Sequence, residues 1–224
     1  MTHNESTQPE KGAHEFRTVS SELLLDAPII AVRRDEVVMP GGSTAMREVV
    51  EHFGAVAIVA LDAHERVAMV HQYRRSVDRR LWELPAGLLD VQGESELLGA
   101  QRELQEEAGL AAGQWSVLAD IVTSPGFCEE AVRIFLAQDL SEVERLDAEG
   151  DEEADMGFAW VGLDEAVDRV ISGEIANSIA ATGILAAYAC VRGGRRPRPV
   201  DAPFDLRPQS MAARRPGPDL KALS

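Results

Sequence analysis

Hydrophobic and polar residues alternate near the start of the chain in a way that predicts a small antiparallel β unit. Three extended segments cover roughly residues 16–25, 29–39 and 45–52, and a Pro-Gly-Gly turn at residues 40–42 separates the last two. Residues 1–14 are polar and are expected to be disordered. The unit is therefore assigned to residues 15–52, and the main domain to residues 53–194.

The main domain opens with a continuous apolar run at residues 54–61, which favours a strand buried on both faces. A buried helical segment is the alternative, but the run is short and begins with glycine. Asp164 and Asn177 are the expected N-caps of two of the later helices. Further strands are predicted near residues 67–74, 115–122, 131–138 and 158–161, and helices near 95–108, 164–172 and 177–191.

The predicted helix at residues 95–108 carries three acidic side chains on one face. At about 100° per residue, Glu106 and Glu107 fall on either side of Glu103. An adjacent apolar stripe would dock the helix on a sheet, and it consists of Leu97, Ala100, Leu104 and Ala108.

Like charges four residues apart destabilise a helix slightly, and among nearby residues only Arg102 offsets them. Such a cluster suits Mg²⁺, which prefers oxygen ligands and usually accepts one or two protein carboxylates. A solvated acidic helix face is the alternative interpretation of the helix alone.

The residues on either side of this helix complete a longer motif. Gly109 follows the helix where a C-terminal glycine is expected. The positions of the motif are Gly87, Glu94, Arg102, Glu103, Leu104, Glu106, Glu107, Gly109 and Leu110. This motif resembles the signature of the Nudix hydrolases, called the Nudix box. One feature departs from the family pattern: six residues rather than five separate Gly87 from Glu94.

Beyond this motif, Pro125 lies sixteen residues after Gly109. This spacing resembles that of the bacterial ADP-ribose pyrophosphatase branch, although GDP-mannose hydrolases are built similarly. The resemblance covers residues 16 to about 200. The resemblance implies an α/β/α sandwich with a mixed sheet, preceded by the antiparallel β unit. It also implies hydrolysis of ADP-ribose to AMP and ribose 5-phosphate, with attack on the adenosyl phosphorus.

The same resemblance implies a role for each site residue. Glu103, Glu107 and the backbone carbonyl of Ala86 would bind Mg²⁺, Glu106 would assist, and Mn²⁺ remains an alternative metal. Two or three such ions would bridge the diphosphate and activate water. The substrate-binding residues would be Arg74 for phosphate, Glu83 and Glu130 for ribose hydroxyls or metal-bound water, and Arg47.

The general base is expected in the acidic stretch between residues 139 and 155, where self-repulsion favours a mobile loop. Glu153 is the first choice and Glu152 the alternative; both could instead be solvated surface residues. Arg47 would reach the site of a partner subunit if the β unit builds the homodimer that relatives form. For His52 and His71, an ordinary role in a strand is the preferred interpretation.

Composition and charge limit which partners and which cellular location are expected. A net charge of −16 disfavours nucleic acid as a partner. The start of the chain has no secretory signal and no apolar run is long enough to span a membrane, so a cytoplasmic protein is expected. Cys128 and Cys190 are expected to be buried and free. The Arg- and Pro-rich residues 195–224 are expected to be a flexible tail, with a tail draped on a partner subunit as the alternative.

Three alternative functions remain open from the sequence. A Nudix enzyme acting on GDP-mannose, NADH or a dinucleoside polyphosphate would have the same box with a different pocket. A ligand sensor without catalysis is disfavoured by the intact Glu103, Glu106 and Glu107. A structural acidic protein would require the whole motif to be coincidental.

Overall fold

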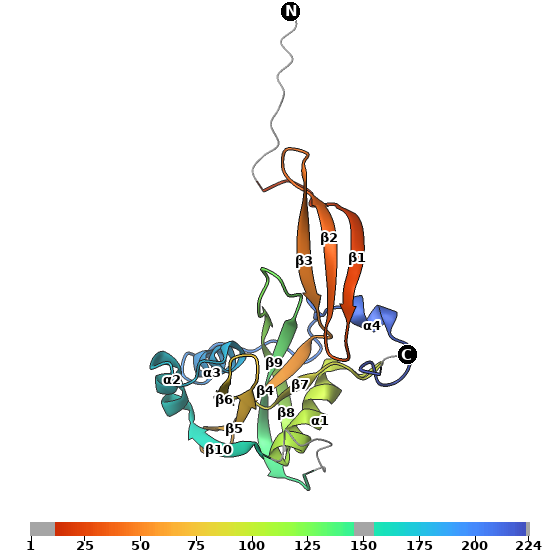
Figure 1. Cartoon of the computed structure of the whole chain (residues 1–224). Helices are drawn as coiled ribbons and strands as arrows, with labels where there is room; N and C mark the ends of the chain where they lie inside the picture. The colour runs from red at the N-terminus through yellow and green to blue at the C-terminus, as the bar shows by residue number, and fades with distance from the viewer. Residues whose placement is uncertain (1–11, 146–154, 223–224) are drawn as a thin grey trace, which may run out of the picture.

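The computed structural model describes residues 12–145 and 155–222 of the chain. Its first element is a three-stranded antiparallel sheet that projects from the body of the molecule (Figure 1). The sheet consists of β1 (Thr18–Asp26), β2 (Ala31–Val38) and β3 (Thr44–Glu51). These strands lie within the three extended segments that the alternating pattern predicts, give or take a residue.

The body contains a four-stranded mixed sheet with the order β7-β4-β9-β8. The central strand β4 (Ala55–Ala60) pairs in parallel with β9 (Ala131–Glu142) and antiparallel with β7 (Ala86–Leu88). The edge strand β8 (Leu110–Val122) runs antiparallel to β9. Strand β4 is buried along its whole length, which confirms the strand interpretation of the apolar run.

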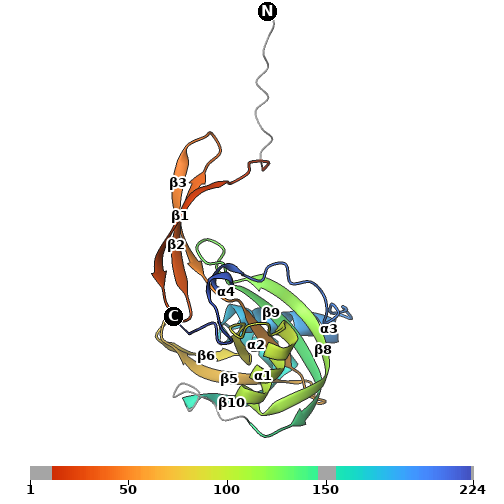
Figure 2. The same ribbon diagram turned by 90° about the vertical axis from the view of Figure 1, so that its right-hand side faces the viewer.

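Helices cover both faces of this sheet. Successive side chains of β4 point to opposite faces, and each face packs in its own hydrophobic cluster. Ala57 and Val59 pack in the cluster that includes α3 (Ser178–Val191) and α2 (Leu163–Ile171). Val56 and Ile58 pack on the opposite side with Ala100 and Leu104 of α1 (Glu96–Ala108). The expected α/β/α sandwich and the apolar stripe of α1 are both confirmed. Figure 2 views the molecule from the side on which α1 lies, so that α1 stands in front of the sheets.

A second three-stranded sheet, with the order β10-β5-β6, lies beside the mixed sheet. It consists of β5 (Arg66–Arg74), β6 (Arg79–Glu83) and β10 (Gly157–Gly162), all paired antiparallel. The sequence prediction contained neither β6 nor β7. Both strands are short, and alternation over three to five residues is too brief to distinguish from a loop.

The ends of the helices follow from local capping. The side chain of Ser95 accepts a hydrogen bond from the backbone N–H of Leu98, and Asn177 does the same for Ala180. Gly109 ends α1 in the left-handed conformation at φ 64°. The prediction for Asp164 was wrong: Gly162 is the N-cap of α2, and Asp164 lies in the first turn, where it pairs with Arg192.

The expectation of a flexible tail is also wrong for residues 195–222, which pack on the body of their own chain. Arg133 is 2% exposed and donates to the carbonyl oxygens of Ala202 and Pro203, at 2.7 Å each. Arg198 and Arg133 both pair with Asp120; although burial opposes the shift, they lower the pKa of that carboxyl. The arginine-rich composition of residues 195–222 therefore reflects specific contacts with the body, such as that of Arg198, rather than disorder.

The tail continues into a short helix, α4 (Ser210–Arg214), whose Met211 is fully buried. Cys128 and Cys190 are free and partly buried. Within residues 12–145 and 155–222, no helix is long and apolar enough to cross a membrane.

Candidate active site

Strand β7 and helix α1 bring two parts of the Nudix box into contact. A Cβ atom added to Gly87 would lie 1.9 Å from the carboxyl carbon of Glu103, so a side chain at this position would displace the end of the Glu103 side chain. The backbone N–H of Ala86 donates to the carboxylate of Glu107 at 2.9 Å. Two carboxylates four residues apart on one helix therefore face the backbone of residues 86–87.

Arg102 neutralises much of the acidic face of α1. Its guanidinium donates to Glu103 at 2.6 Å, to Glu106 at 3.0 Å and to Glu94 at 3.1 Å. Burial raises the pKa of Glu103 to about 7, although its contacts with Arg102 act in the opposite direction. The structure thus places a partly desolvated carboxylate at the centre of a charged network.

The groups that meet between α1 and β7 are suited to binding a hard divalent cation. Glu103 and Glu107 provide carboxylate oxygens, and the glycine at position 87 leaves room for Glu103 against the main chain. Oxygen ligands of this type are those that Mg²⁺ takes, together with several waters. Within the part of the chain that the structure describes, no three His, Cys, Asp or Glu side chains already form a closed metal-binding group. Substrate and water would have to supply further ligands.

A pocket of about 500 Å³ opens beside the box. It brings together four of the residues predicted for the site, namely Arg74, Glu83, Ala86 and Glu130. These four come from three strands and from the loop that follows β8, so they converge only in the fold. The volume falls within the range of pockets that bind small molecules.

Arg74 and Glu83 form one side of this pocket. The guanidinium of Arg74 donates to both carboxylate oxygens of Glu83, at 3.0 and 2.6 Å, and Gln72 adds a third hydrogen bond at 3.2 Å. Glu83 is 3% exposed, whereas the side chain of Arg74 is 45% exposed. The buried carboxylate therefore orients an arginine that remains accessible from the pocket.

Glu130 lies on the other side, near a histidine for which the sequence predicted no role in a site. Thr123 donates its hydroxyl to Glu130 at 2.5 Å, and the imidazole Nε2 of His52 is 3.6 Å from the same carboxylate. The other ring nitrogen of His52 accepts from the N–H of Gly54, and burial lowers the pKa of the imidazole. Gly54 has φ +80°, a backbone conformation that favours glycine. The glycine two residues after His52 was thus the sequence signal that could have indicated this local structure.

Three predicted residues lie elsewhere or cannot be placed. Arg47 is on β3, opposite Asp35, and does not line the pocket; its guanidinium donates to the carbonyl of Met46. Glu152 and Glu153 lie outside the described residues.

The chain matches the models of two protein families. A NUDIX domain matches residues 44–180, and a nucleoside diphosphate sugar hydrolase N-terminal domain matches residues 16–50. The first match contains the whole box, and the second coincides with the projecting sheet.

The chain is also similar to individual proteins. It is 55% identical to an ADP-ribose pyrophosphatase from Mycobacterium tuberculosis (strain ATCC 25618 / H37Rv), over 90% of this chain and 97% of that one. It is 36% identical to an ADP-ribose pyrophosphatase from Bacillus subtilis (strain 168), over 72% and 86% of the two chains. A crystal structure of an ADP compounds hydrolase has the same fold, with a TM-score of 0.71, 20% identity and coverage of 82% of this chain and 97% of that one.

Proposed function

The chain belongs to the Nudix hydrolase family, and on that premise we propose that it hydrolyses the diphosphate of ADP-ribose to AMP and ribose 5-phosphate. The observation that carries this proposal is the meeting of Glu103 and Glu107 with residues 86–87 at the edge of a pocket. The similarity to two ADP-ribose pyrophosphatases supports the choice of substrate.

Glu103, Glu107 and the backbone carbonyl of Ala86 would hold Mg²⁺, with Glu106 in support. When bound, such ions lower the pKa of a coordinated water and stabilise charge that develops on phosphorus. The protein contributes the geometry. Docking of α1 on β7 fixes the carboxylates, and Arg102 limits the repulsion among them while the metal is absent.

Arg74 is the residue proposed to bind the diphosphate. A guanidinium can donate two parallel hydrogen bonds to phosphate oxygens, which a lysine cannot do in the same geometry. Glu83 holds this guanidinium from the buried side. Glu130 and Glu83 are proposed to accept hydrogen bonds from ribose hydroxyls or from metal-bound water, since both line the same pocket.

Glu153 is proposed as the general base, with Glu152 as its alternative. Asp155, at the end of the acidic segment, forms an ion pair with Arg80 of β6. This contact holds the end of the acidic segment beside the β5–β6 sheet, whose Arg74 and Glu83 line the pocket.

The projecting β1–β3 sheet is proposed as the dimerisation unit, over residues 15–52. Strand β1 is exposed along its whole length and carries large apolar side chains, including Leu23 and Leu25 at 46% and 48% exposure. Apolar surface of this kind is typical of an interface. Arg47, on the same sheet, would then reach the site of the partner subunit.

Substrate turnover with and without Mg²⁺ tests the proposal. ADP-ribose, GDP-mannose and NADH should be compared at matched concentrations, with AMP and ribose 5-phosphate identified as products. Metal-dependent release of AMP from ADP-ribose, well above turnover of the other two, is the expected result. Preferential cleavage of GDP-mannose or NADH would contradict the assignment of the substrate.

A further inference from the structure

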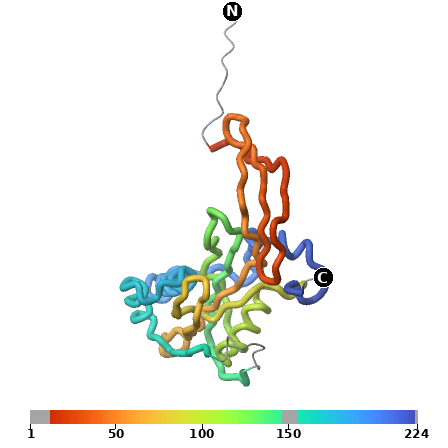
Figure 3. The backbone as a smooth tube through the Cα atoms, in the orientation of Figure 1, coloured from red at the N-terminus to blue at the C-terminus, as the bar shows by residue number. Residues whose placement is uncertain are grey.

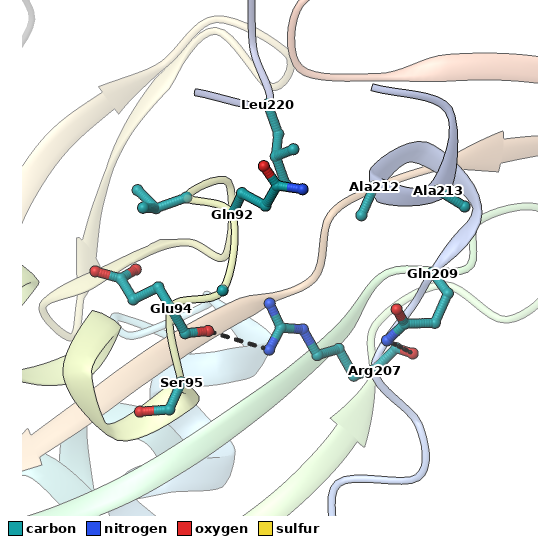
Figure 4. A pocket seen from close by; sticks show the side chains of 10 residues that line it. Gln92, Glu94, Ser95, Arg207, Gln209, Ala212, Ala213 and Leu220 are labelled. Atoms are coloured by element: carbon teal, nitrogen blue, oxygen red, sulfur yellow. Dashed lines mark hydrogen bonds between the residues drawn. The ribbon is translucent and has the colours of Figure 1, made fainter. Parts of the chain in front are cut away.

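The end of the chain crosses the loop that joins β7 to α1. Asp219 and Val91 form an antiparallel bridge, the N–H of Gln92 donates to the carbonyl of Pro218 at 3.0 Å, and the N–H of Leu220 donates to the carbonyl of Asp90 at 2.8 Å. Figure 4 shows Leu220 beside Gln92, with Arg207 of the same tail reaching the backbone of Glu94. A distant part of the sequence thus extends the strand-like pairing of this loop.

The crossing segment is firmly anchored at its base. Leu220 is 3% exposed and packs in a cluster with Ala31, Phe53 and Met211. Arg215, 6% exposed, donates to the carbonyl of Leu220 at 3.0 Å and to that of Pro28 at 2.9 Å. Arg215 also forms an ion pair with Asp26 at the end of β1. The segment is therefore fastened to the base of the projecting sheet (Figure 3).

The loop that it holds lies next to the proposed metal site. Residues 89–92 begin directly after β7, the strand that places Ala86 and Gly87 against Glu107 and Glu103. Asp90 is 5% exposed and its carboxylate pairs with the ammonium of Lys221 at 2.8 Å. A smaller cavity of about 310 Å³ is lined by Asp90, Lys221 and Arg102, and Arg102 contacts Glu103 directly.

We propose that residues 215–221, here named the C-terminal strap, position the loop that follows β7 and thereby hold the metal-binding backbone of that strand. The reason is geometric. A carbonyl oxygen can act as a metal ligand only if its strand is held at a fixed distance from the carboxylates of α1. The loop contains Gly93 and one residue more than the Nudix pattern, so a second set of backbone hydrogen bonds would limit its conformational freedom.

This inference rests on the proposed function, and it assigns to Leu220 and Arg215 the role of positioning residues. It also connects the projecting sheet with the metal site. Asp26 and Pro28 contact Arg215, Arg215 contacts Leu220, and Leu220 contacts Asp90. A shift at the base of the sheet would therefore be transmitted to residues 89–92.

Leu220→Ala is the variant that tests the strap, because it removes the buried anchor without changing any charge. Ile175→Ala is the matched control: Ile175 is equally buried, at 2%, but lies in the cluster of α2 and α3. Both variants should lose stability by similar amounts. If Leu220→Ala does not fold, Leu220→Val provides the same comparison with a smaller cavity.

Two measurements are made on each variant. The first is the Mg²⁺ concentration that gives half-maximal turnover of ADP-ribose, which should rise about tenfold in Leu220→Ala, as expected when a group that orients metal ligands is lost. The second is amide hydrogen exchange of residues 86–92 without metal or substrate, which should accelerate in the same variant. Leu220→Met conserves the volume of the side chain, so both values should stay close to those of the unmodified protein.

Unchanged metal dependence and unchanged exchange of this loop in Leu220→Ala would overturn the proposal, as would an equal change in Ile175→Ala. The exchange measurement needs no substrate. Absence of ADP-ribose turnover in the unmodified protein would therefore count against the proposed function, while the exchange data would still decide the role of the strap.

Discussion

The carboxylate of Glu103 lies where a side chain at Gly87 would have to be. The distance of 1.9 Å between its carboxyl carbon and an added Cβ is far below any real contact, so the two positions depend on each other. Because residue 87 has no Cβ, the carboxylate can lie directly against the backbone of β7. The glycine of the motif thus leaves this space to the acid.

Gly87→Ala is predicted to displace the carboxylate of Glu103 and so to weaken metal binding. The methyl group would occupy the space of that carboxylate, and the end of the Glu103 side chain would have to move away from β7. Turnover at low Mg²⁺ should fall more than turnover at saturating Mg²⁺. Gly162→Ala is the control, since a Cβ there meets no atom within 4 Å. Equal metal dependence in both variants would show that the contact is not part of the site.

Replacing Glu107 by Gln should abolish most of the activity. The amide keeps the size of the side chain but removes a negative charge from the proposed metal site, and a loss of about a thousandfold in kcat or more is expected. Glu165→Gln, on the exposed face of α2, serves as the control. Near-normal turnover by Glu107→Gln would sink the assignment of this residue to the metal.

Replacing Glu153 by Gln should lower kcat while KM changes little, because a general base acts in the chemical step rather than in substrate binding. A decrease of about a hundredfold or more is expected. Steady-state kinetics of Glu153→Gln and Glu152→Gln, measured side by side, distinguish the two candidates. If Glu152→Gln is inactive and Glu153→Gln is not, the base is Glu152.

Arg74→Ala is predicted mainly to raise KM for ADP-ribose. The guanidinium is accessible from the pocket and is held by Glu83, so its loss removes a contact with the diphosphate and leaves the core intact. Arg74→Lys should restore little, because an ammonium does not donate two parallel hydrogen bonds. Arg75→Ala removes a neighbouring arginine whose ion pair with Asp78 is exposed, and should have no effect. A KM and kcat unchanged in Arg74→Ala would leave this arginine with a structural role alone.

Patterns of local sequence were sufficient to predict the main elements of the fold. The apolar run around Val56 and Ile58 is buried on both faces, as the two-sided sheet requires. The stripe of Ala100 and Leu104 packs on that sheet and orients the acidic face of α1. These features depend on residues close together in the chain, whose periodicity is visible without knowledge of the fold.

Contacts between distant residues could not be predicted in the same way. Nothing near Arg133 in the sequence indicates that its guanidinium would donate hydrogen bonds to the carbonyl oxygens of Ala202 and Pro203. The polar composition of the tail suggested flexibility, whereas a buried donor on the body, the guanidinium of Arg133, holds it in place. His52 likewise lines the pocket beside Glu130, which comes from the distant loop between β8 and β9.

Direct assay of ADP-ribose turnover is the measurement that tests the account most closely. The purified protein should be incubated with ADP-ribose, GDP-mannose and NADH, each with Mg²⁺ and with a chelator. The account predicts that AMP and ribose 5-phosphate form rapidly from ADP-ribose in the presence of Mg²⁺ and that the chelator abolishes this. Tight binding of ADP-ribose without turnover in the presence of Mg²⁺ would contradict it and would favour a ligand sensor.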